Sequence, residues 1–333
     1  MLKKPKILVV GSFVMDLIAS TEKAPNSGET VIGKSFRTAP GGKGANQAVQ
    51  CARLGAQVTM VGQVGGDSFG QEMLATASAA GVDVSRVLVD KDVSSGVGHI
   101  LLEVTEHGAQ NRITVVPGAN FTLKSEDVAW LKDEIGQYDL LMMQLELPMD
   151  VICTVASYAK AAGVPVMLNP APAAPLPEEL LACVTYLSPN EHEAAAITGQ
   201  RLYADENGVN EEDMKKVAAA LREKGVENVI ITLGGNGSAV AGADGVHYTA
   251  CVKMDHVADP TAAGDSFVAA FCTGITAGLS QDQALNFASH TAAITVSRMG
   301  AMPSLPTLAE VRSLMEQRGY KGFDLSELDA LQS

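Results

Sequence analysis

Short apolar runs alternate with segments of helical pattern along most of this chain. The runs ILVV (7–10), LLMM (140–143) and VIIT (229–232) lack the apolar–polar alternation of a strand with one solvated face. Strands of this kind are covered on both faces, as in a parallel sheet between two layers of helices. The order of the segments therefore predicts a three-layer α/β/α fold with a mainly parallel sheet.

The pattern places individual strands and helices along the chain. The predicted strands cover residues 6–11, 58–65, 138–145, 164–170 and 228–234. The predicted helices cover residues 43–54, 68–80, 149–162, 264–277 and 281–296.

Two segments depart from this rhythm. Residues 29–39 and 96–115 alternate apolar and polar residues, with turn signals between them, which is typical of antiparallel strands with one open face. We interpret them as a small β lid inserted in a single domain over residues 1–317, followed by a tail, 318–333, of no assigned role. An exposed strand edge has unpaired backbone groups that can bond to another chain, so the lid could pair with a second copy and form a homodimer.

Composition excludes several classes of partner. The 333 residues are 47% hydrophobic and carry a net charge of −14 with no basic cluster, which argues against nucleic-acid binding. No apolar run approaches the ~20 residues of a membrane span, and the N-terminal segment lacks a convincing cleavage site. The five cysteines are scattered without a C-x-x-C pair, which favours reduced thiols in a cytoplasmic protein.

Residues 28–35, GETVIGKS, fit the P-loop pattern G-x-x-x-x-G-K-[ST]. A working P-loop lies between a strand and a helix, whose N-terminal amides meet the phosphate. Here the turn-like STEKAPNS precedes the motif, and FRTAPGG follows it with no room for a helix. We therefore interpret the segment as an exposed strand with a chance match.

A more suitable setting for phosphate is DPTAAGDSF, residues 259–267. Small residues lead into an apolar helix, and unhindered amides at a helix N-terminus attract anions. Asp265 has two possible roles at this point: a helix N-cap, or a group that takes part in chemistry beside the anion site.

Further polar residues follow the predicted strands. GGKGANQA (41–48) opens a helix with glycines that permit close approach of a ligand, or that simply form a flexible turn. Asp16, Glu146 and Asn190 each follow a strand, and ligands gather at the carboxyl ends of parallel strands.

Taken together, these motifs resemble the ribokinase family of carbohydrate kinases, the phosphofructokinase-B group. The resemblance extends from Lys6 to about Gln317 and rests on GGKGANQA and DPTAAGDSF, with GSFVMD, PNSGETV, MMQLE, LNPAPA, SPNEHE, ITLGGNG and GAMPS in order. It implies transfer of the γ-phosphoryl group of ATP to a sugar hydroxyl, with the 5-hydroxyl of D-ribose expected first.

The same resemblance implies roles for individual residues. Asp265 would be the catalytic base, and the amides of Ala262, Ala263, Gly264 and Asp265 would form the anion hole. The sugar site would also include Asp16, Gly42, Lys43, Asn46 and Glu146.

The nucleotide and metal sites are likewise implied by the resemblance. The nucleotide, with Mg²⁺, would meet Asn190, Glu193, Thr232, Gly234 and Gly237. A K⁺ site would use Asp259, Thr261, Thr295, Arg298, Gly300 and Ser304, mostly through carbonyl oxygens.

One position departs from the family pattern. The family's first motif is commonly G-S-x-N-x-D, whereas this chain has Val14 at the asparagine. Valine neither donates nor accepts a hydrogen bond, so the site should tolerate a deoxy sugar better. Ribose stays the first expectation, with 2-deoxyribose or another furanose or nucleoside as the alternative; a non-enzymatic sugar sensor is disfavoured because both motifs are intact.

Overall fold

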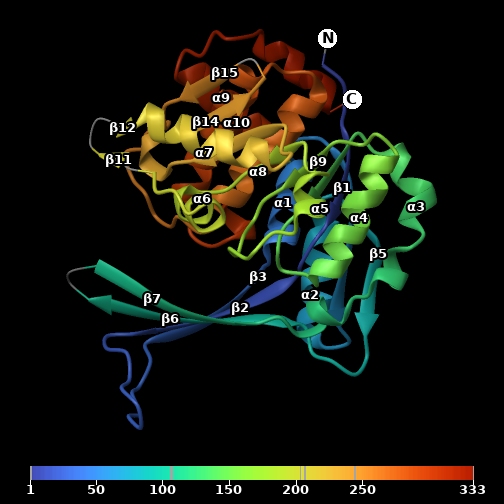
Figure 1. Cartoon of the computed structure of the whole chain (residues 1–333). Helices are drawn as coiled ribbons and strands as arrows, with labels where there is room; N and C mark the ends of the chain where they lie inside the picture. The colour runs from blue at the N-terminus through green and yellow to red at the C-terminus, as the bar shows by residue number, and fades with distance from the viewer. Residues whose placement is uncertain (1, 106–107, 203, 206–207, 244, 333) are drawn as a thin grey trace.

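The computed structural model describes residues 2–105, 108–202, 204–205, 208–243 and 245–332. A nine-stranded sheet forms its centre, with strand order β15-β14-β13-β10-β9-β8-β1-β4-β5 (Figure 1). Every pairing from β13 to β5 is parallel, whereas β13–β14 and β14–β15 are antiparallel. The predicted α/β fold with a mainly parallel sheet is confirmed. In chain order the strands are β1 (Lys6–Val10), β4 (Gln57–Gly65), β5 (Val82–Asp90), β8 (Leu140–Met143), β9 (Val166–Leu168), β10 (Tyr186–Leu187), β13 (Asn228–Thr232), β14 (Ser238–Gly242) and β15 (Gly245–Thr249).

Helices cover both faces of this sheet. The five predicted helices are present as α1, α2, α4, α8 and α9, each within one residue of the expected bounds at either end. The helices are α1 (Lys43–Arg53), α2 (Ser68–Ala79), α3 (Leu131–Glu134), α4 (Met149–Ala161), α5 (Glu178–Leu181), α6 (Glu191–Thr198), α7 (Glu211–Glu223), α8 (Ala263–Ala277), α9 (Gln281–Val296) and α10 (Leu308–Gln317).

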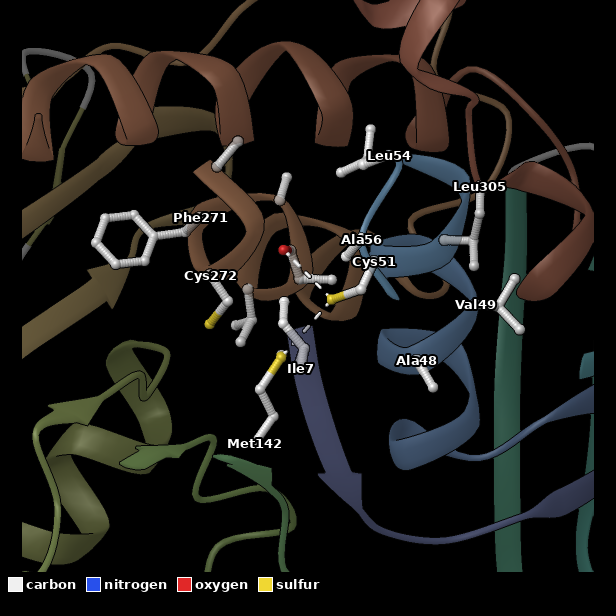
Figure 2. Close-up of a cluster of buried hydrophobic side chains, with 14 of the residues drawn as sticks. Ile7, Ala48, Val49, Cys51, Leu54, Ala56, Met142, Phe271, Cys272 and Leu305 are labelled. Atoms are coloured by element: carbon white, nitrogen blue, oxygen red, sulfur yellow. Dashed lines mark hydrogen bonds between the residues drawn. The ribbon is translucent and has the colours of Figure 1, made fainter. Parts of the chain in front are cut away.

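The core is divided by the sheet into two hydrophobic clusters. Ile7 and Val9 of β1 face the cluster of α1, α2, α8, α9 and α10, while Leu8 and Val10 face that of α3 to α7. Burial on both faces explains why the strand sequence is continuously apolar. In the first cluster Cys51 lies under α8, with its Sγ 3.7 Å from Sδ of Met142 (Figure 2).

A separate four-stranded sheet, which we call the lid, extends from this body (Figure 1). It has the order β3-β2-β6-β7, formed by Ser35–Gly41, Val14–Thr21, Gly96–Thr105 and Gly108–Val116. Residues 106 and 107, inside the predicted segment 96–115, lie outside the described residues.

The lid corrects three sequence-based predictions. Its strand β2 was missed, because GSFVMD was interpreted as the end of the first strand. The central pair β2–β6 is parallel, not antiparallel. Residues 28–34 form no strand, and β3 begins only at Ser35, so GETVIGKS is a loop rather than an exposed strand. The physical reason is that Asn26 and Glu29 close a local turn, with the Asn26 amide 2.9 Å from Oε2 of Glu29.

The C-terminal tail packs onto the main body. Its 3-10 segment Leu325–Leu331 buries Leu328 and Leu331 in the first cluster, and Arg312 of α10 forms an ion pair with Asp329. Burying such a leucine stabilises a fold by about 1.5–3 kcal/mol, so the tail contributes to stability. Among the described residues, no helix is long and apolar enough to span a bilayer.

Candidate active site

A cleft of about 1010 Å³ lies between the lid and the main body. Residues from β2, β3, β6 and β7 form one wall, and the N-terminal ends of α1 and α8 form the other. Ten of the predicted site residues line it: Asp16, Gly42, Lys43, Asn46, Glu146, Asp259, Thr261, Ala262, Asp265 and Gly300.

Asp265 lies in the first turn of α8 and lines the cleft. The N-cap position of α8 is occupied by Ala262, whose side chain makes no capping hydrogen bond. The interpretation of Asp265 as the N-cap is therefore wrong. Ala262 has φ 60°, the only positive φ among the described non-glycine residues. Such a conformation costs about 1–2 kcal/mol and is concentrated at functional sites.

The backbone of this turn supplies anion-binding groups. The Ala263 amide already donates to the Pro260 carbonyl at 3.2 Å, but the amides of Gly264 and Asp265 have no acceptor in the described part of the chain. A Cβ built on Gly264 would meet nothing within 4 Å, so the turn is open on that side. Free amides at a helix N-terminus attract phosphate.

Two neighbouring side chains of α1 hold the carboxylate of Asp265. Asn46 Nδ2 donates to Oδ2 at 2.9 Å, and Gln47 Nε2 donates to Oδ1 at 3.1 Å. Asp265 is 7% exposed and Gln47 is fully buried. Sequence reasoning missed Gln47, although it lies within GGKGANQA one residue after Asn46.

Glu146 connects the turn between β1 and β2 to the start of α1. Its Oε2 accepts from the Ser12 hydroxyl at 2.5 Å and from the Lys43 amide at 3.0 Å. Ser12 was quoted in GSFVMD but not singled out as a site residue. Burial lowers the pKa of Lys43, but the attraction of Asp265, Glu146 and Glu193 outweighs it and raises that pKa. Lys43 is therefore a fixed positive charge among three carboxylates.

Asp16 enters the cleft from the lid strand β2. Burial raises its pKa to about 6, with smaller contributions from the negative charges of Glu146 and Asp259. Desolvation disfavours a charged carboxyl, so Asp16 changes protonation close to neutral pH. A carboxyl with such a shift inside a cleft is typical of a functional site.

Gly42 explains how the lid and α1 can approach so closely. It has φ 96°, and a Cβ there would lie 2.7 Å from the Val14 amide nitrogen and 2.9 Å from the Ser12 oxygen. Only glycine avoids both the strain and the overlap. Gly42 thus permits close approach of two backbone segments, and the close approach of a ligand to the GGKGANQA glycines stays a prediction.

The five predicted nucleotide residues lie outside the cleft wall. Asn190 and Glu193 form a reciprocal capping box at the start of α6: Asn190 Oδ1 accepts the Glu193 amide at 2.8 Å, and Glu193 Oε2 accepts the Asn190 amide at 2.9 Å. Thr232 pairs with Asn190 through a β-bridge, and Gly234 and Gly237 lie in the turn after β13. Burial raises the pKa of Glu193 despite the nearby Lys43.

Asp259 connects two of the segments that carry the residues predicted for K⁺. Its Oδ1 accepts from the Thr261 amide at 2.9 Å, and its Oδ2 accepts from the Gly300 amide at 2.9 Å. Thr295 is buried at the end of α9, and its Oγ1 donates to Ser266 of α8 at 3.0 Å. The remaining two point elsewhere, since Arg298 pairs with Glu310 and the Ser304 hydroxyl donates to the Ala301 carbonyl.

Val14, which replaces the asparagine of the family pattern, lines the cleft. The substitution can therefore affect which sugar the cleft binds. Val14 is 5% exposed and lies at the start of β2, paired with Gly41 and Gly96. The wall of the cleft is thus apolar at this position.

Comparisons with known proteins agree with this geometry. Residues 4–308 match the model of the pfkB family carbohydrate kinases. The chain is 39% identical to a ribokinase of Schizosaccharomyces pombe, over 92% of this chain and 96% of the relative, and 37% identical to one of Bacillus subtilis, over 93% and 99%. The solved structure of Arabidopsis thaliana ribokinase complexed with ribose and ATP superposes with a TM-score of 0.85 at 31% identity, over 94% of this chain and 99% of that one. A match of this extent settles the family, and the chain belongs to the pfkB family of carbohydrate kinases.

Proposed function

We propose that the protein is an ATP-dependent ribokinase, which transfers the γ-phosphoryl group of ATP to the 5-hydroxyl of D-ribose. One observation carries the proposal: Asp265 lines the cleft beside the free amides at the start of α8. The ribokinases that resemble the chain over nearly their full length support ribose as the sugar.

Asp265 acts as the general base. Each of its carboxylate oxygens accepts one hydrogen bond from α1, and each retains a lone pair for a substrate hydroxyl. Asp265 accepts the proton of the attacking hydroxyl as the oxygen bonds to the γ-phosphorus and the bond from phosphorus to the leaving ADP oxygen breaks. The amides of Gly264 and Asp265 then stabilise the charge on the transferring group.

The sugar lies under the lid. Carboxylates accept hydrogen bonds from vicinal hydroxyls, which suits Asp16 and Glu146, while Lys43 and Asn46 supply donors. Asp16 belongs to the lid and the other three to the main body, so a bound sugar would tie the two together.

The nucleotide lies beyond the cleft, over the turns that follow β10 and β13, where Asn190, Glu193, Thr232, Gly234 and Gly237 are found. Mg²⁺, which is held chiefly by substrate phosphates and water, would neutralise phosphate charge there, and Glu193 supplies a hard oxygen. K⁺ would order the amides of α8 from the adjoining loops, using the oxygens of Asp259, Thr261 and Gly300; the positions of Thr295, Arg298 and Ser304 are proposed only for their carbonyls.

A second candidate substrate is 2-deoxyribose, because Val14 makes one wall of the cleft apolar. A sugar hydroxyl that faces an apolar wall makes no hydrogen bond with it and adds no binding free energy. The protein should therefore discriminate only weakly between ribose and 2-deoxyribose.

ADP release from purified protein tests both candidates. Ribose, 2-deoxyribose, fructose, tagatose and a nucleoside are compared with Mg²⁺ present, with and without K⁺. A higher kcat/KM for ribose than for the other acceptors is the expected result. Absence of turnover on every acceptor, with sugar binding retained, would favour a sensor instead.

We also propose a cytoplasmic homodimer that pairs through the lid. The lid exposes apolar side chains that do not line the cleft, among them Phe36 and Val116. All five cysteines are free thiols, which suits a reducing compartment. Light scattering at working concentration should give twice the 34.6 kDa chain mass.

A further inference from the structure

A chain of buried side-chain amides leads to the carboxylate of Asp265. We infer that Gln47 is a positioning residue for the catalytic base and that Gln144 fixes the orientation of Gln47. The inference rests on the proposed role of Asp265. Neither glutamine belongs to the cleft wall, and both are almost fully buried, so neither is placed to bind substrate.

Both hydrogens of the Gln47 amide group are used. Nε2 donates to Oδ1 of Asp265 at 3.1 Å and to Oδ1 of Asn169 at 3.2 Å. Asn169 is itself anchored, because its Nδ2 donates to the Ser188 carbonyl at 2.8 Å. The Gln47 side chain therefore connects α8 with the carboxyl ends of β9 and β10, and it holds one carboxylate oxygen in a fixed place.

Gln144 determines which end of the Gln47 amide faces Asp265. Its Nε2 donates to Oε1 of Gln47 at 2.7 Å, so the oxygen of Gln47 is held on the side away from the carboxylate. A reversed amide would bring two acceptors together and leave a buried donor unpaired, which is costly. Gln144 packs against Gly11, where a Cβ would lie 2.4 Å from its Oε1, and that oxygen accepts no hydrogen bond from the described residues, so Gln47 is the group that orients Gln144 in turn.

The competing explanation is that these amides only satisfy one another in a polar part of the core. The two explanations differ at the base. A donor to an ionised carboxylate favours the ionised form, so its loss should change the pH at which the base becomes protonated. A group that only fills the core would change stability and leave that pH unaltered.

Gln47→Leu removes the donor and keeps the side-chain size. We expect kcat to fall about tenfold and the acid limb of the kcat profile to move up by about one pH unit, because a hydrogen bond to a charged group is lost. The KM for ATP should stay within about twofold. Gln47→Glu places a second carboxylate beside the first, so its acid limb should lie higher still. Gln144→Leu should also move the acid limb of the kcat profile to higher pH, by less than Gln47→Leu does.

Gln50→Leu is the matched control. Gln50 is a fully buried glutamine one turn further along α1, and its Nε2 donates to the Pro306 carbonyl at 2.9 Å, away from Asp265. It should lower the Tm less than Gln47→Leu does, because one side-chain hydrogen bond is lost instead of three, and leave kcat and the acid limb unchanged. An unchanged acid limb in Gln47→Leu, or an equal shift in Gln50→Leu, overturns the inference.

A measurement without turnover separates this inference from the proposed function. Carboxyl ¹³C chemical shifts are followed with pH in the free protein, and the Asp265 signal is assigned by its loss in Asp265→Asn. A higher titration midpoint in Gln47→Leu supports the inference even if no sugar is turned over. An unchanged midpoint refutes it even if ribose is phosphorylated at full rate.

Discussion

Residues 28–35 match the P-loop pattern in full, whereas residues 261–265, TAAGD, match no P-loop pattern, yet only the second segment opens a helix at the cleft. Residues 28–35 lie in the loop that leads from β2 to β3, away from the main body (Figure 1). Lys34, the lysine of this segment, is held by Glu22 on the surface at 2.7 Å. Phosphate binding depends on free amides at the start of a helix, and a short sequence motif does not guarantee that setting.

Substitution of Asp265 tests the segment at the start of α8. Asp265→Asn should reduce kcat by about a thousandfold or more, since an amide cannot accept the proton. ATP binding, measured by calorimetry, should be retained because the amides of α8 are unchanged. Turnover near that of the unsubstituted protein would remove Asp265 from the role of base.

A second substitution tests the open turn itself. Gly264→Ala adds a methyl group where the structure has free space, so the fold should tolerate it and the Tm should not fall. If phosphate approaches the amides there, kcat/KM for ATP should drop about a hundredfold. Unchanged kinetics would show that the anion approaches from another side.

The lid carboxyl Asp16 predicts a pH dependence. Its pKa is raised to about 6, so below that pH the protonated form dominates and loses acceptor capacity. We expect kcat/KM for the sugar to fall about tenfold per pH unit below pH 6 and to level off above it. Asp16→Asn should lower kcat/KM at neutral pH and remove this limb; a limb that persists unchanged would belong to another group.

Val14→Asn tests whether the apolar wall of the lid weakens the preference for ribose over 2-deoxyribose. Restoring a polar group should raise the ratio of kcat/KM for ribose over 2-deoxyribose by about tenfold or less. The ratio is taken from competition between the two sugars in one mixture. A constant ratio would mean that water or neighbouring side chains already compensate for valine.

The smallest expected effect concerns the P-loop-like segment. Lys34→Ala should change ATP affinity by less than about twofold, because the exposed pair with Glu22 contributes little. Isothermal calorimetry with ATP gives the value directly. A loss of ATP affinity above tenfold would indicate that the nucleotide binds at residues 28–35.

The sequence alone predicted the layered fold because burial on both faces of a strand leaves a local, readable pattern. The continuous apolar runs of β1 and β8 divide their side chains between the two core clusters, as that pattern requires. The lid was only partly predictable. Its strand β2 follows β1 after three residues, and Gly11 and Ser12 were interpreted as the end of one strand instead of a break between two.

The tertiary structure alone decided how the site is assembled. Asn46 and Gln47 meet Asp265 across 219 and 218 residues of chain, and no spacing rule relates such positions. It also decided that Asp265 is not the helix cap, since the N-cap of α8 is Ala262, in a left-handed conformation. Hydrophobic pattern is repeated along many residues and survives local error, whereas a hydrogen bond depends on one distance and one direction that only the packed chain defines.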